Sequence, residues 1–148
     1  MNCVSSKRLF SGKWLLFRSC STVSADWKAI CEEIGKGNLW SAKVSLTRRS
    51  KSERIHLICV YTPNFYDVNE VCSVGILLSR LGLVAKRIYY KPDAFTDANI
   101  YADSGPASIY SFETGSDSLT KTSGFSRLSL QDQKEIDKAF ESVGVSHS

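Results

Sequence analysis

The pattern of apolar and polar positions is clearest in the middle of the chain. Residues 54–62 form the longest nearly continuous apolar run, bounded by polar residues on both sides. Both alternating sets of positions are mostly apolar: Ile55, Leu57, Cys59 and Tyr61 in one set, Ile58 and Val60 in the other, beside His56. Because a strand that packs on both faces has this pattern, the run predicts a central β-strand.

A period of two precedes this run. From residue 40 to 47, the apolar positions Trp40, Ala42, Val44 and Leu46 alternate with Ser41, Lys43, Ser45 and Thr47. The pattern is typical of a strand with one packed and one wet face. The polar loop 48–53 then predicts a hairpin with the central strand. Further strands are expected at 12–17 and 86–91.

Two segments have the period of an amphipathic helix. Trp27, Ile30, Cys31 and Ile34 form one stripe that predicts a first helix, with Ser24 as its N-cap and Gly35 and Gly37 at its end. The second helix is expected over residues 67–80. Asp67 and Glu70 there have the spacing of a capping box, and Gly82 follows the helix. Trp14, Trp27 and Trp40 are all expected at packed positions.

This order of elements is typical of the α+β class. We predict a curved, mostly antiparallel sheet with both helices packed on one face, and the other face open. Four residues are expected to line the open face: Lys43, Ser45, Arg87 and Lys91. The open face is therefore predicted to be concave and positively charged.

The chain of 148 residues predicts one domain between two less ordered ends. We expect a disordered or truncated start over 1–11 and the α+β domain over 12–112. Residues 113–148 are expected to form a linker rich in Ser, Thr and Gly, followed by a weakly docked or isolated helix over 130–140.

Apolar anchors of this terminal helix are few: Leu130, Ile136 and Phe140. Before it, a turn over 91–97 and two short strands over 99–101 and 108–112 are expected.

Charge is distributed unevenly. The formal net charge is +4, but residues 1–91 hold 15 Lys and Arg against 6 Asp and Glu, whereas residues 92–148 hold 4 against 9. An anionic partner would bind the first part. Four cations gather within seven residues: Arg48, Arg49, Lys51 and Arg54. They fit either a solvated loop or a phosphate site, since guanidinium groups match phosphate oxygens.

The five cysteines are odd in number and contain no C-x-x-C pair. This favours a reducing compartment, cytoplasmic or nuclear, and argues against zinc or a disulfide framework. Residues 1–11 have the composition of a targeting leader, so organellar import is the less favoured alternative. No apolar run has the length of a membrane span.

Candidate catalytic residues are scarce. The two histidines are His56, within the central strand, and His147, in the tail. Asp93 and Asp97 lie in a turn, where turn capping explains Asp93. Because no nucleophile has a recognisable base and orienting group, we predict a protein that is not an enzyme and that uses no metal or cofactor.

Three groups of segments resemble a known family: residues 11–17; residues 42–45 with 58–62; and residues 90–96 with 100–101. They look like the basophilic leukaemia-expressed protein family, an uncharacterised eukaryotic group whose fold is similar to translation initiation factor 4E, the messenger-RNA cap-binding protein. The resemblance implies that fold without its first strands. It also implies that the basic hairpin corresponds to the part of the cap-binding factor that holds phosphates.

Cap recognition itself is not expected, because it requires a methylated guanine held between two indole rings. The tryptophans of this chain are predicted to be packed. We therefore predict a non-enzymatic binding module that contacts RNA or another polyanion weakly, through the open face and the hairpin. The alternative is a protein-interaction module that uses the two helices and has no nucleic-acid role. The sequence leaves the oligomeric state open.

Overall fold

The computed structural model describes residues 10–48, 54–98, 107–116 and 118–142. Their strands form one sheet, in which every pairing is antiparallel, and the predicted α+β class is confirmed. The strands are β1 Gly12–Arg18, β2 Ser41–Arg48, β3 Arg54–Thr62, β4 Arg87–Pro92, β5 Tyr110–Glu113 and β6 Thr120–Lys121. The helices are α1 Val23–Gly35, α2 Val68–Arg80, α3 Asp93–Asp97 and α4 Leu130–Ser142, with a 3₁₀ helix, η3, over Ser123–Arg127.

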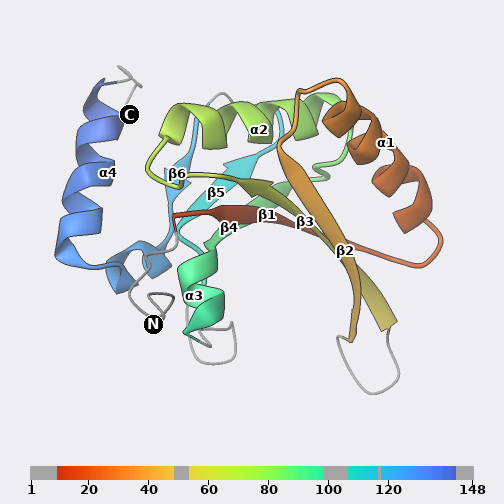
Figure 1. Cartoon of the computed structure of the whole chain (residues 1–148), viewed down its shortest axis with the longest axis horizontal. Coiled ribbons are helices and arrows are strands. Elements are labelled where there is room, and N and C mark those ends of the chain that lie inside the picture. The colour runs from red at the N-terminus through yellow and green to blue at the C-terminus, as the bar shows by residue number, and fades with distance from the viewer. Residues whose placement is uncertain (1–9, 49–53, 99–106, 117, 143–148) are drawn as a thin grey trace, which may run out of the picture.

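The strand order is β2-β3-β1-β4-β5-β6. The apolar run 54–62 is the interior strand β3, as predicted, and β2 pairs with it as the other arm of the expected hairpin. The sheet is arched, with α1 and α2 over one face and α3 below the other, while α4 lies beside the β6 end (Figure 1). The described residues contain no helix with the length and hydropathy needed to cross a membrane.

The core lies between the arched sheet and helices α1 and α2. Trp14 of β1 is fully buried there, and its ring lies edge-on to Tyr90 at 5.3 Å and to Phe112 at 6.2 Å. Its indole nitrogen donates to the Val71 carbonyl of α2 at 3.1 Å. Gly75 on the same helix is buried against the Phe112 ring. A Cβ added at this position would lie 3.0 Å from the ring carbons, which is closer than ordinary contact. The glycine therefore allows α2 to approach the sheet closely.

The second helix begins as predicted: the Asp67 side chain accepts from the Glu70 amide at 3.2 Å. The first helix differs. It begins at Val23, its N-cap is Thr22 rather than Ser24, and Thr22 makes no side-chain cap bond. Cys31, expected within the apolar stripe, is exposed. The buried residues of the helix are Val23, Ile30 and Glu33, so its buried face is rotated away from Cys31.

The three tryptophans differ in burial. Trp14 is buried and Trp27 packs partly buried against the core, as expected. Trp40 is 57% exposed, so its predicted packed position is wrong. It lies next to β2, the outermost strand on that side of the sheet, and Leu46 of this strand is also exposed. The layer of helices does not extend over these two side chains.

The region after residue 113 is more ordered than expected. The segment expected to be a linker forms β6 and η3, and Leu119 and Leu128 within it are buried. In α4, Ile136 is fully buried and Phe140 packs on Tyr110 at 6.1 Å, whereas Leu130 is 75% exposed. The helix is therefore docked, with two of the three expected anchors. The strand expected at 108–112 corresponds to β5, and the one expected at 99–101 lies outside the described residues.

Candidate binding face of the sheet

The sheet face opposite α1 and α2 is called the open face below. Pairing partners share a face, and the register places Leu15 beside Cys59 and Tyr89, and Cys59 beside Lys43. Alternation along the strands then assigns to this face Lys13 and Phe17 of β1, Ser45 of β2, Leu57 and Tyr61 of β3, and Arg87 and Lys91 of β4. The four residues predicted to share a face therefore do so.

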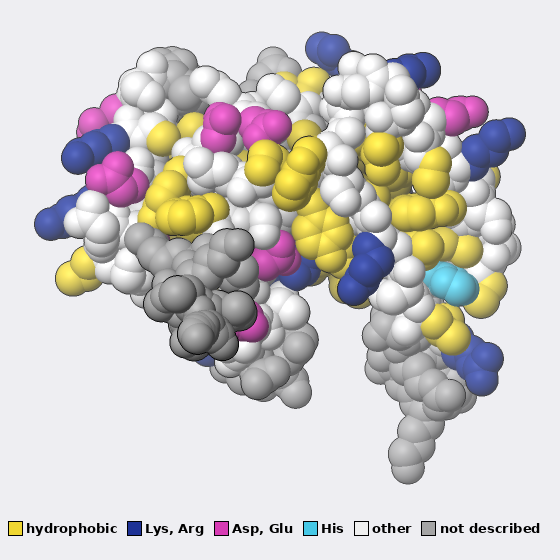
Figure 2. Space-filling model, in the orientation of Figure 1, with side chains coloured by type: hydrophobic (Ala, Val, Ile, Leu, Met, Phe, Trp, Pro, Cys, Tyr) yellow, Lys and Arg dark blue, Asp and Glu magenta, His cyan; other side chains and the backbone are white. Residues whose placement is uncertain are grey.

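The open face lies on the hollow side of the arch. In the space-filling view, the outline of the molecule is indented below the sheet, between α3 and the ends of β2 and β3 (Figure 2). On this face Phe17, Lys43 and Tyr89 are exposed, whereas Lys13 and Lys91 are buried at the end where α3 lies.

Lys91 is only 6% exposed and does not line an open surface as expected. The reason is α3: the segment expected to be a turn folds into a helix that packs back on the sheet and buries Phe95. Burial lowers the pKa of the Lys91 ammonium, and the neighbouring charge of Lys13 lowers it further.

A polar network joins α3 to β1. The Lys13 Nζ lies 2.5 Å from Asp93 Oδ1 and 2.7 Å from Thr96 Oγ1, and Ser11 Oγ donates to Asp93 Oδ2 at 2.6 Å. Asp93 was expected to cap a turn. It is instead the first residue of α3, and its carboxylate is the counterion of a lysine that is 7% exposed. This end of the face has a structural role.

The other cations of the face differ in their availability. Arg87 is exposed and forms an ion pair with Glu113, its partner in the register of β4 and β5. Hydrogen bonds to Glu113 and Tyr89 raise the pKa of the Arg87 guanidinium. Lys43 is exposed and forms no ion pair with the described residues. Lys43 is therefore the predicted cation best placed to meet a ligand.

The hairpin cations do not extend this surface within the described residues. Arg54 alternates with Ile55 and lies on the side of Ile58, which faces the helices. For Arg48 the backbone is described, and it pairs with Arg54. Arg49 and Lys51 lie outside the described residues. The described residues therefore do not show one continuous basic surface over the hairpin and the open face. Lys43 of β2 is the exposed cation of the predicted site that they place on the open face without an ion pair.

A pocket of about 360 Å³ opens where β1 and β4 diverge. Their pairing ends at Leu15 and Tyr89, and the strands separate beyond this point. Arg18 bridges the gap: it donates from Nη1 to the Phe17 carbonyl at 2.9 Å and from Nη2 to the Leu83 carbonyl. Its Nε donates to Asp26 Oδ2 at 2.5 Å, which neutralises the charge.

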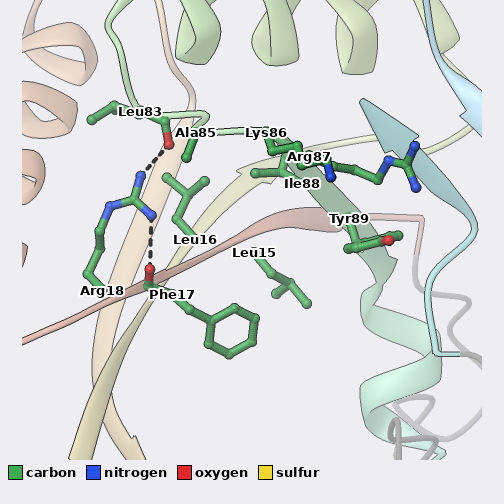
Figure 3. A pocket seen from close by; sticks show the side chains of 10 residues that line it. All are labelled: Leu15, Leu16, Phe17, Arg18, Leu83, Ala85, Lys86, Arg87, Ile88 and Tyr89. Atoms are coloured by element: carbon green, nitrogen blue, oxygen red, sulfur yellow. Dashed lines mark hydrogen bonds between the residues drawn. The ribbon is translucent and has the colours of Figure 1, made fainter. Parts of the chain in front are cut away.

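The side chains of Leu15, Phe17 and Tyr89 project to one side of the sheet at this pocket, and Leu16 points to the other (Figure 3). Phe17 is 48% exposed and Tyr89 is 43% exposed, values that are high for rings on a sheet face. Lys86 lies at the same pocket, exposed and without an ion pair to the described residues. Sequence reasoning missed Phe17, although its alternation with the buried Leu16 was a usable signal.

Two weakly acidic groups lie nearer the centre of the face. Burial raises the pKa of the Cys59 thiol. Burial also raises the pKa of the Tyr61 phenol to about 12, with smaller contributions from Cys59 and Asp93. Both groups are protonated at neutral pH, so the centre of the face offers hydrogen-bond donors and apolar surface, and no thiolate or phenolate nucleophile.

The fold and this face define a class of α+β proteins: an antiparallel sheet covered by helices on one face and exposing aromatic rings on the other. Comparison with known families then identifies the family. Residues 2–99 match the family described as "Basophilic leukemia-expressed protein Bles03", and the chain belongs to this family. The match extends from before β1 to just after α3 and includes Phe17, Lys43 and Tyr89.

Proposed function

We propose that this protein is a non-enzymatic binding module that holds single-stranded RNA, or a similar polyanion with stackable rings, on its open face. The observation that carries the proposal is the exposure of Phe17 and Tyr89 on the uncovered side of the sheet. Sheet-borne aromatic rings stack unpaired bases, and the contact is largely independent of sequence because every base has a π face.

Charge supports the same ligand. Lys43 on the open face and Lys86 at the pocket that holds the rings are exposed cations without ion pairs to the described residues. A strand whose bases stack on Phe17 and Tyr89 has phosphates within reach of such flexible ammonium groups. Arg87 contributes less, because Glu113 already compensates its charge.

The resemblance to the fold of translation initiation factor 4E agrees with a ligand in the hollow of the arch. Recognition of a methylated cap is not part of the proposal. Trp14 is buried in the core, Trp27 packs on it from α1, and Trp40 lies at the β2 edge. These positions do not provide the pair of facing indole rings that would hold a cationic base.

Protein docking on α1 and α2 has less support. The exposed large apolar residues of the described part of the chain are Phe10, Phe17, Trp40, Leu46, Tyr89 and Leu130. None of them lies on those two helices, whereas two lie on the open face. An apolar partner would therefore find little to bind on α1 and α2 themselves, although Leu46 is exposed on that side of the sheet at its β2 edge.

The test uses a fluorescein-labelled single-stranded RNA of about 12 nucleotides, a length within the site sizes of single-strand binding proteins. Fluorescence anisotropy gives the Kd of the native chain and of Phe17→Ala/Tyr89→Ala. Loss of two stacking contacts predicts Kd at least about tenfold higher with an unchanged salt slope. The control, Trp40→Ala/Leu46→Ala, removes two exposed apolar side chains elsewhere and should leave Kd unchanged.

The salt dependence tests the cations separately. For Lys43→Ala/Lys86→Ala, the slope of log K against log salt should decrease by about 1.4, since each phosphate contact to a single strand contributes about 0.7. The control Lys28→Ala/Arg80→Ala removes exposed cations from α1 and α2 and should change it little. A native chain that does not bind the RNA, or one whose affinity survives loss of both rings, overturns the proposal.

A further inference from the structure

Cys20 and His56 meet at the surface, although 36 positions separate them in the sequence. The Cys20 Sγ lies 3.4 Å from the His56 Nε2. Pairing of β1 with β3 brings them together, because Arg18, two residues before Cys20, is the register partner of His56. A thiol and an imidazole at this separation form a nucleophile and proton acceptor pair.

The backbone around Cys20 holds the thiol at the start of a helix. Residues 19–22 form the turn into α1, closed by the bond from the Val23 amide to the Ser19 carbonyl at 3.1 Å. Cys20 therefore lies two residues before the N-cap Thr22 of a 13-residue helix. This turn fixes the position of Cys20 between the end of β1 and the start of α1.

Within the described residues, the contact recorded for the Cys20 thiol is with His56. The guanidinium of Arg18, the β1 register partner of His56, is engaged with Asp26 of α1 at 2.5 Å. The β2 partner of His56 in the register is Leu46, an apolar residue. Cys20 is exposed and His56 is half-buried, so a small reagent can reach the sulfur while the ring stays held by the sheet.

We propose that Cys20 is a modification site that reacts with low-molecular-weight disulfides such as glutathione disulfide, with His56 as its proton acceptor. The Cys20 S–H proton passes to His56 Nε2, and the sulfur attacks one sulfur of the disulfide. The S–S bond of the reagent breaks as the new one forms, and the leaving thiolate takes the proton from the imidazolium. The products are a mixed disulfide on Cys20 and one free thiol, so the exchange needs no other oxidant.

The other described cysteines differ from Cys20 in exposure or surroundings. Cys31 of α1 is also exposed, but its thiol has no hydrogen-bond partner among the described residues, which makes it a matched control. Cys59 is buried, and burial raises the pKa of its thiol, which suppresses reaction. Cys72 is partly buried on α2.

The experiment incubates the full chain with glutathione disulfide at neutral pH and measures mixed-disulfide formation at each cysteine by peptide mass spectrometry. Cys20 should react at least about tenfold faster than Cys31, the scale of a modest general-base contribution. In His56→Gln, the Cys20 rate should fall to that of Cys31, and the Cys31 rate should stay constant. Leu46→Ala, a change beside His56 that keeps the imidazole, should leave both rates unchanged.

Protection of the buried Cys59 in the same samples reports whether each variant is folded. Comparison of Cys20 with Cys31 in the native chain stands even if His56→Gln unfolds. Equal rates at the two sites in the native chain, or a Cys20 rate that is unchanged in folded His56→Gln, overturn the proposal. Neither result bears on RNA binding by the open face.

Discussion

The Lys13 ammonium nitrogen lies 2.5 Å from Asp93 Oδ1, although the two residues are 80 positions apart in the sequence. The contact fixes α3 against β1 at the closed end of the open face. Because Lys13 is 7% exposed, its charge depends on this counterion rather than on water.

Asp93→Asn removes the counterion and leaves the lysine buried. We expect a loss of about 3 kcal/mol in the free energy of unfolding, the scale for breaking a largely buried pair from one side. Chemical denaturation measures it. The double variant Lys13→Met/Asp93→Leu should recover most of the loss, because no buried charge remains unpaired. A double variant as unstable as the single one would contradict this account.

Thr62 and Tyr90 form a second buried contact, with 2.6 Å between their hydroxyl oxygens. Thr62 is 1% exposed and Tyr90 is fully buried, so water cannot replace either partner. Thr62→Val should lower the free energy of unfolding by about 1–3 kcal/mol, because it leaves the Tyr90 hydroxyl without this partner. Tyr90→Phe should relieve part of that loss in the double variant. Strictly additive effects in the double-mutant cycle would show that the bond contributes nothing.

Alkaline pH should destabilise the fold through its tyrosines. Burial raises the pKa of Tyr61 to about 12, and it raises the pKa values of Tyr90 and Tyr110. A phenol whose pKa is higher in the folded chain gives stability that is complete below the unfolded value of about 10 and is lost as pH rises toward 12. As pH rises from about 10 to about 12, the tyrosinate absorbance of the folded chain should therefore increase at higher pH than that of the urea-unfolded chain. Coincident titration curves would refute the prediction, and Tyr61→Phe should reduce the lag.

Docking of α4 rests on Ile136, which is fully buried. Ile136→Ala should lower the free energy of unfolding by about 3 kcal/mol, through lost burial and the cavity left behind. Leu130→Ala on the same helix is the control. Its side chain is 75% exposed, so the change should be below about 0.5 kcal/mol. Similar small effects at both positions would indicate a helix that is not part of the cooperative fold.

Local signals in the sequence predicted much of this fold. Asp67 and Glu70 gave the start of α2 because a cap needs only residues within one turn. The hairpin of β2 and β3 followed from alternation on both sides of a short polar loop. Alternation also placed Lys43 and Arg87 on one face, since the apolar alternates of both strands were expected to pack on the same core.

Non-local packing explains the errors. Trp40 is exposed because it lies beside an outermost strand, a property set by strand order rather than by its neighbours in sequence. Lys91 is buried because Asp93–Asp97 folds into α3 and returns over the sheet. Cys20 and His56 become neighbours only through the pairing of β1 with β3. Alternation could have placed the rings of Phe17 and Tyr89 on one face, but their degree of exposure depends on the helices and loops that pack nearby.

The family match ends at residue 99, yet Tyr110 and Phe112 of β5 are buried at 0% and 1% exposure. Phe112 closes the space above Gly75, and the Tyr110 hydroxyl donates to the Phe65 carbonyl at 2.8 Å. Excising the matched segment would therefore strip one flank of β4 and open the aromatic cluster to solvent. The autonomous unit for expression or transplantation reaches at least to β5, and a fragment cut at the border of the match is expected to be recovered as insoluble material.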